Sequence, residues 1–192
     1  MKKLLYSFLI LPLLVFSNHA ISQEKMFMKV SAPGYNFNGG VTDVGYQNQI
    51  EVFSFSDGMQ GCATTSLGSS AAAACKTSPT SFQFITSLSL ATIDFRSAML
   101  QGKVLNSVDF VVTKSSGGAQ MVYYKIHMEN VLISSLQEGG AQGGGNPSIS
   151  ISLSPTRIAW EVITQSTTGA TGPSSSYGWD FSKNTVFNYT FN

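Results

Sequence analysis

Charged side chains are scarce in this sequence of 192 residues. Lys, Arg, Asp and Glu together make up 11% of it, about half their usual share in a soluble globular protein. This scarcity excludes a coiled coil held by ion pairs and a nucleic-acid binder that works through a basic stripe. It does not exclude a core, because 43% of the residues are hydrophobic. The composition, rich in Ser, Thr and Gly, favours one compact domain built mainly of strands.

No apolar run reaches the roughly 20 residues that a membrane-spanning helix needs. The longest run, Leu4–Phe16, follows two lysines and precedes the small-x-small sequence Ala20-Ile21-Ser22. This order predicts a signal peptide over residues 1–22 and an exported domain, periplasmic or secreted, over residues 23–192. An uncleaved N-terminal anchor is the alternative. The domain alone has nine basic and ten acidic residues, so we expect no electrostatic attraction to nucleic acid or to an anionic membrane.

Cysteine is as scarce as charge, with Cys62 and Cys75 the only two in the chain. An even number in an exported protein predicts one disulfide. This disulfide would close a loop of about 14 residues and contribute about 3 kcal/mol to stability. The residues between the two cysteines include no His, Asp or Glu, so the sequence gives no reason to expect a metal there. Buried free thiols are the alternative.

Sequence motifs of enzymes are absent as well. The chain contains no HExxH, CxxC, GxSxG or Walker-type motif. Gly139–Gly145 is rich in glycine but precedes a strand pattern, so it cannot place a phosphate at a helix N-terminus. His127 lies in a strand pattern and is interpreted as structural, and Asp94 and Asp109 are interpreted as isolated carboxylates. We therefore expect no catalytic residues, no cofactor and no metal.

Alternating apolar patterns predict a series of short strands separated by loops rich in Gly and Ser. The clearest is Ser148–Ser154, in which every second residue is Ile or Leu. The others are Phe27–Val30, Gln49–Phe55, Phe82–Ser89, Ser107–Thr113, Ala119–Leu136, Arg157–Thr164 and Tyr177–Phe181. Gln49–Phe55 is apolar on both faces and is predicted to be covered on both sides. Ala119–Leu136 is long, so we expect a bend or bulge near Glu129-Asn130.

Residues 91–101 interrupt this pattern, because their apolar side chains recur at helical spacing. Thr92 is the predicted N-cap, Asp94 falls in the first turn, and Gly102 ends the helix. The sequence therefore predicts a mainly β fold, a compact β-barrel of two packed antiparallel sheets with one short flanking α-helix.

The order of these pieces resembles that of a known family. The pieces that carry the resemblance are Met26–Val30, Gln49–Phe55 with Gly58 after it, the helix Ala91–Gln101, Val122–Ile126, Val131–Ser135, Gly139–Gly145, the strand with Ile149, Ile151 and Leu153, and Tyr177–Asp180. Together they cover roughly residues 26 to 187. In this order they resemble the haemolysin-coregulated protein (Hcp) family, the tube proteins of type VI secretion.

The resemblance implies a six-membered ring of identical subunits that stacks into a tube, carries small effectors in its lumen and is itself released from the cell. Partners would be further copies of the chain, and spike, sheath or cargo proteins. The resemblance also implies that the helix lies near the boundary between subunits, and its apolar residues do not fit one narrow stripe of about 100°. The candidate interface residues are Ile93, Phe95, Ala98 and Met99.

Two features depart from the family pattern. Family tubes assemble in the bacterial cytoplasm, whereas the sequence predicts an export signal for this chain. The loop Ser56–Pro79 carries a predicted disulfide, which a cytoplasmic tube would lack. We therefore expect an exported Hcp-like tube-forming or secreted effector protein. The alternative is a monomeric exported binding module that contacts host or neighbouring-cell surfaces through Ser56–Pro79 and Gln165–Ser176.

Overall fold

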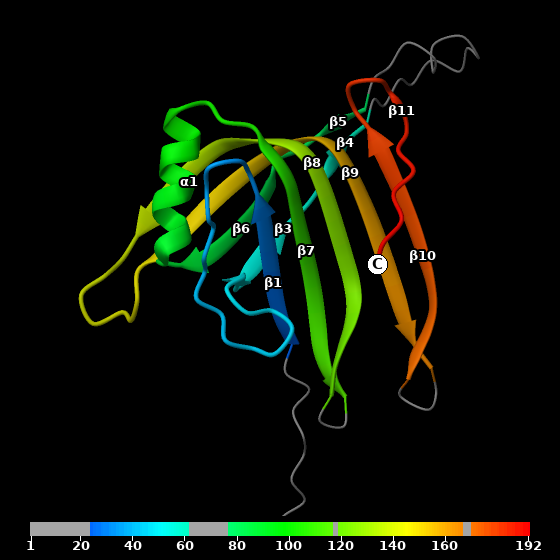
Figure 1. Cartoon of the computed structure of the whole chain (residues 1–192), viewed down its shortest axis with the longest axis horizontal. Helices are drawn as coiled ribbons and strands as arrows, with labels where there is room; N and C mark the ends of the chain where they lie inside the picture. The colour runs from blue at the N-terminus through cyan, green and yellow to red at the C-terminus, as the bar shows by residue number, and fades with distance from the viewer. Residues whose placement is uncertain (1–23, 62–76, 117–118, 167–169) are drawn as a thin grey trace, which may run out of the picture.

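The computed structural model describes residues 24–61, 77–116, 119–166 and 170–192. These residues form a mainly β fold with one helix (Figure 1). The elements are β1 (Glu24–Ser31), β2 (Ile50–Val52), β3 (Ser54–Ser56), β4 (Met59–Gln60), β5 (Ser78–Pro79), β6 (Phe82–Ser87), α1 (Leu90–Leu100), β7 (Leu105–Ser116), β8 (Ala119–Gly139), β9 (Ser148–Gln165), β10 (Thr171–Asp180) and β11 (Thr185–Val186).

Backbone pairing closes most of these strands into a barrel. β2 pairs with β1, β1 with β7, β7 with β8, β8 with β9, β9 with β6, and β6 with β3, always antiparallel. Only Phe53 separates β2 from β3, and its amide donates to the carbonyl oxygen of Ile85 in β6 at 2.8 Å. The expected barrel with a flanking helix is confirmed, but the two packed sheets expected for it are not, because its strands belong to one nine-stranded sheet that closes on itself.

The strand expected at Gln49–Phe55 changes partner in the middle. β2 pairs with β1 and β3 pairs with β6, so the chain leaves one neighbour for the other at Phe53. At this crossing the Phe53 side chain is exposed, and so is Glu51. The prediction that this strand is covered on both sides is therefore wrong.

The strand β9 is continuous where the sequence indicated two separate strands. Its first part pairs with β6 and its second part with β10. Pro155 falls where β9 passes from one partner to the other, a position at which the missing proline N–H is tolerated. β10 also begins earlier than expected, since Ser174–Ser176 pair with β9. The expected loop Gln165–Ser176 is therefore mostly strand.

The three longest strands bend together. In β8 Met128 and Val131 are both buried although they lie three residues apart, and Asn130 between them has a φ of 50°. The residues opposite these two in the neighbouring strands are also buried and also lie three residues apart. They are Leu105 and Val108 in β7, and Pro155 and Ile158 in β9. The bend predicted near Glu129-Asn130 is confirmed, and it involves the neighbouring strands as well.

The helix α1 covers one side of the barrel in Figure 1. It begins one residue earlier than predicted: Ser89 is the N-cap, and its amide donates to Oγ1 of Thr92 at 3.1 Å. Thr92 is therefore the third helical residue rather than the cap, and Asp94 lies beyond the first turn. Gly102 has a φ of 61° and follows the C-cap, as its position predicted. The described part of the chain contains no helix long and apolar enough to cross a membrane.

Aromatic side chains fill the space between α1 and the barrel. The ring of Phe95 packs against Phe37 and Phe84, with centroid distances of 4.8 and 5.9 Å. Deeper in the barrel Phe110 packs against Phe55 and Phe82. This core fixes the helix on the barrel and decides which of its side chains face outward.

Candidate functional site

The structure divides the four candidate interface residues of α1 into two pairs. Phe95 and Ala98 are 1% and 0% exposed and belong to the core of the protomer, so they cannot contact a neighbouring subunit. Ile93 is 65% exposed, and Met99 is also exposed. The helix is therefore apolar on two faces. Of the four candidates Ile93 lies on the face that remains free in the protomer, and Met99, four residues after Phe95, lies at the edge of the buried face.

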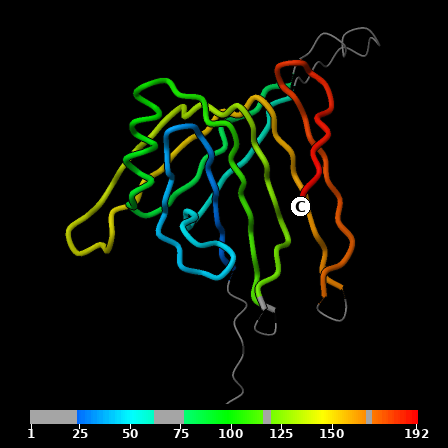
Figure 2. Tube along the Cα trace, viewed as in Figure 1, coloured from blue at the N-terminus to red at the C-terminus, as the bar shows by residue number. Residues whose placement is uncertain are grey.

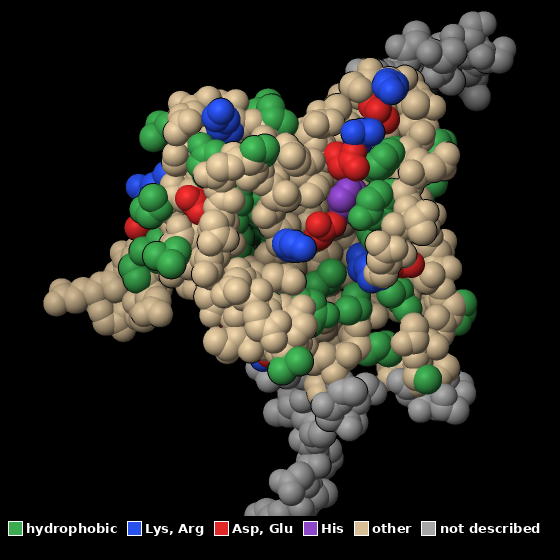
Figure 3. Space-filling model, viewed as in Figure 1, with side chains coloured by type: hydrophobic (Ala, Val, Ile, Leu, Met, Phe, Trp, Pro, Cys, Tyr) green, Lys and Arg blue, Asp and Glu red, His purple; other side chains and the backbone are tan. Residues whose placement is uncertain are grey.

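The free side of the helix is an apolar patch, which we call the outer face of α1. Its members are Leu90, Ile93 and Leu100, and Met99 lies at its edge. Hydrophobic side chains are exposed over this part of the molecule in Figure 3. An ion pair between Arg96 and Glu138 ties the helix to the end of β8. Clustered apolar side chains on a rigid element mark a contact surface more often than scattered ones do.

Cys62 and Cys75 lie outside the described residues, so the disulfide stays a prediction. The residues on either side of that segment are held together. β4 pairs with β5, Met59 opposite Pro79 and Gln60 opposite Ser78, and the Thr80 amide donates to the carbonyl oxygen of Gly58 at 2.9 Å.

A charged network lies on the outer face of β7, β8 and β9, where acidic and basic side chains surround the histidine in Figure 3. Nδ1 of His127 is 2.6 Å from Oδ1 of Asp109, and its Nε2 is 3.3 Å from Oε1 of Glu129. Arg157 pairs with Glu129 at 2.5 Å. Asp109 is thus a partner of His127, and the prediction of an isolated carboxylate is wrong at this position.

The surroundings of His127 decide its protonation. Burial lowers its pKa, but the hydrogen bonds and charges of Asp109 and Glu129 outweigh burial and raise the pKa above the ordinary value. Both ring nitrogens face carboxylates, and the ring is 6% exposed. Within the described ranges neither nitrogen is directed at a nucleophile, and the two carboxylates stabilise a charge on the ring.

The last residues of the chain cross this charged network. We call Phe187–Asn192 the tail; it follows β11 and returns over β9 and β8, as both Figure 1 and Figure 2 show. The ring of Tyr189 stacks on His127 with a centroid distance of 3.8 Å and an interplanar angle of 8°. No strand was predicted for the tail, although its alternating aromatics (FNYTF) are a period-2 signal of an extended segment.

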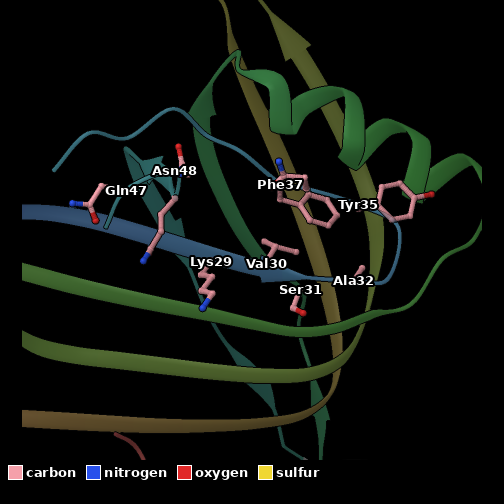
Figure 4. A pocket seen from close by; sticks show the side chains of 10 residues that line it. Lys29, Val30, Ser31, Ala32, Tyr35, Phe37, Gln47 and Asn48 are labelled. Carbon is pink, nitrogen blue, oxygen red and sulfur yellow. The ribbon is translucent and has the colours of Figure 1, made fainter. Parts of the chain in front are cut away.

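The cavities contain no catalytic arrangement among the described residues. Figure 4 shows one of them, a cavity of about 290 Å³ between β1 and the segment that leads to β2. Of the described residues that line it, Lys29 is the one that carries a charge, and the amides of Gln47 and Asn48 line it as well. Elsewhere Nε1 of Trp160 donates to Asp57 at 2.6 Å, and burial raises the pKa of that carboxyl. No group of His, Cys, Asp and Glu in the described ranges could hold a metal ion.

Comparison with solved structures finds the same fold in proteins of low sequence identity. A type six secretion system protein superposes with a TM-score of 0.76 at 22% identity, over 86% of this chain and 100% of that one. Hcp1 from Salmonella typhimurium gives 0.67 at 21%, over 85% and 99%. A type VI secretion system effector from Yersinia pestis gives 0.61 at 22%, over 81% and 98%.

Comparison with curated protein sequences finds no match. The family described as "Type VI secretion system effector, Hcp" matches residues 27–162, which span most of the barrel and the whole helix. The sequence match and the structural matches therefore agree on the same family. The chain belongs to the Hcp family of type VI secretion system effectors.

Proposed function

We propose that this protein is an exported Hcp-family subunit that assembles into a homohexameric ring, with the outer face of α1 at the boundary between neighbours. Membership of the family makes the chain a component of a secretion system and not an enzyme. The observation that carries the ring proposal is the apolar patch on α1, which the protomer leaves uncovered although the opposite side of the helix is anchored in the core by Phe95 and Ala98.

The exposure and the helical spacing of these side chains support this proposal. Leu100 is 87% exposed, and Ile93 lies seven residues away along the same side of the helix. A ring with one kind of subunit uses a head-to-tail contact, in which a surface of one copy meets a different surface of the next. The outer face of α1 would therefore dock on a second surface of its neighbour rather than on another copy of itself.

The assembly is tested by size-exclusion chromatography with light scattering. We expect a species of about six times the protomer mass, because a closed ring has a fixed number of copies. A strict monomer at high concentration would contradict the ring and favour the alternative, an exported module that binds cell surfaces. That module would lose binding when Ser56–Pro79 is shortened. Stacking of rings, and contact with spike, sheath or small cargo proteins, presuppose that the ring forms.

Export is a separate part of the proposal and has its own measurement. We expect mass spectrometry of the periplasmic or secreted protein to show an N-terminus between Ile21 and Glu24, because the small residues before this point suit a signal peptidase. The same non-reduced sample should be lighter by two hydrogens than after reduction, with Cys62 joined to Cys75. An intact Met1 contradicts cleavage, and free thiols contradict the disulfide.

A further inference from the structure

We propose that the tail is a detachable strap across the outer face of the sheet, and that protonation of His127 holds it closed. The proposal does not depend on ring assembly. It rests on how the strands beneath the tail are built, on which groups the tail contacts, and on the one contact whose charge changes near neutral pH.

The sheet is shaped to receive the tail. His127, Ala159 and Gly178 are paired neighbours across β8, β9 and β10. A Cβ at Gly178 would lie 2.3 Å from the carbonyl oxygen of Phe187 and 3.1 Å from Cβ of Ala159, so only glycine admits the tail at this distance. The Phe187 amide donates to the carbonyl oxygen of Gly178 at 3.0 Å. This row of one aromatic and two very small residues forms the floor under the tail.

The tail is held mainly by its side chains, since residues 188–192 make no backbone–backbone hydrogen bond to the described residues. Each of its three aromatic rings lies against a basic side chain. The Phe187 ring is 5.0 Å from the guanidinium of Arg157, Tyr189 stacks on His127, and the Phe191 ring is 5.8 Å from Nζ of Lys125. Aromatic faces attract cations, so all three contacts are strongest when the basic group is charged.

Carboxylates face each of these basic groups. On β7 and β8, Asp109 and Glu129 face His127, and Glu129 also pairs with Arg157. On β9, Glu161 lies 3.0 Å from Nζ of Lys125, which in turn donates to the main-chain oxygen of Asn192 at 3.0 Å. On β1, Lys29 lies directly opposite Asp109 in the strand register of β1 and β7. Burial, followed by the nearby charges of Asp109 and Glu129, raises the pKa of Tyr189, so its phenol stays neutral.

His127 is the group in this set whose charge changes near neutral pH, because Arg and Lys stay protonated there. A neutral imidazole has one N–H and can donate to only one of its two carboxylates. The other carboxylate would then face a ring lone pair beneath the covering Tyr189 ring. Since the carboxylates raise the pKa of His127, the strap is held fully below the ordinary histidine pKa. Its hold is lost as the pH rises through the raised value.

The proposal is tested on the full-length chain by titrating His127 with NMR. The chain has two histidines. The NMR signal that is lost in His127→Gln is the signal of His127. Binding and protonation are reciprocal, so removing the stacked ring with Tyr189→Ala should lower the pKa of His127 by about 0.5 to 1 pH unit. Tyr177→Ala, which removes an exposed ring elsewhere in β10, is the control and should leave it unchanged. An unchanged pKa in Tyr189→Ala overturns the proposal.

Tail mobility gives a second reading on the same samples. In the native sequence the backbone amides of Thr190 and Phe191 should change from ordered to mobile between about pH 6 and about pH 9. In His127→Gln they should be mobile throughout, with no pH dependence. A tail that is equally ordered at both pH values, or one that stays ordered in His127→Gln, overturns the proposal.

Discussion

Ala98→Glu should unfold the domain. Ala98 is 0% exposed and lies on the face of α1 that packs into the barrel with Phe95. A glutamate there must bury an unpaired charge as well as four more heavy atoms, and uncompensated buried charges cost about 3–5 kcal/mol. That is comparable to the whole stability of many domains, about 5–15 kcal/mol. Circular dichroism and denaturant unfolding measure the effect, and we expect the β signal to be lost or the unfolding midpoint to fall sharply.

The matched control for this change is Leu100→Glu. Leu100 is in the last turn of the same helix and is mostly exposed. The same acidic residue there should alter the free energy of unfolding of the protomer by no more than about 0.5 kcal/mol. If Ala98→Glu folds with the stability of the control, α1 is not packed on the barrel as described.

Local patterns predicted most strands because alternation depends only on which side of a strand faces the core. Phe82, Phe84 and Thr86 alternate in the sequence and are all buried in β6. The errors arose where a strand changes its partner, as at Phe53 and at Pro155. Both changes of partner depend on which distant strand supplies the hydrogen bonds. A local sequence pattern does not contain that information.

The two faces of α1 were predictable from spacing, but their assignment to core or surface was not. Ala91, Phe95 and Ala98 recur at intervals of four and three and form the buried stripe, whereas Ile93 and Leu100 lie seven residues apart on the other side. Residue size suggests the opposite choice, because Ile and Leu are usually better buried than Ala. Small residues are favoured here because the rings of Phe37 and Phe84 already fill the space beside Phe95.

The His127 network illustrates what sequence alone leaves out. Asp109 and His127 are 18 residues apart and meet because β7 and β8 pair in one particular register. Tyr189 reaches His127 because the chain turns after β10 and returns over Gly178. Each residue type was visible in the sequence, but a pairing register and a chain reversal bring them together.

Ile93→Glu should break the proposed ring into protomers without unfolding them. Ile93 is mostly exposed in the protomer, so its replacement should change protomer stability by about 0.5 kcal/mol at most. In a ring whose boundary covers this side chain, the glutamate would be buried without a partner in every one of the repeated contacts. A cost of several kcal/mol per contact corresponds to a loss of 10²-fold or more in the association constant. Light scattering at micromolar concentration should then give a mass close to one protomer.

The control for this change is Val44→Glu, an equally drastic substitution at an exposed apolar side chain in the segment between β1 and β2. It should leave both the circular dichroism spectrum and the assembled mass as they are in the native protein. A fully assembled Ile93→Glu variant would remove the outer face of α1 from the boundary between subunits. An unfolded one would mean that Ile93 supports the protomer itself, and the apolar patch would then need a structural explanation rather than an assembly role.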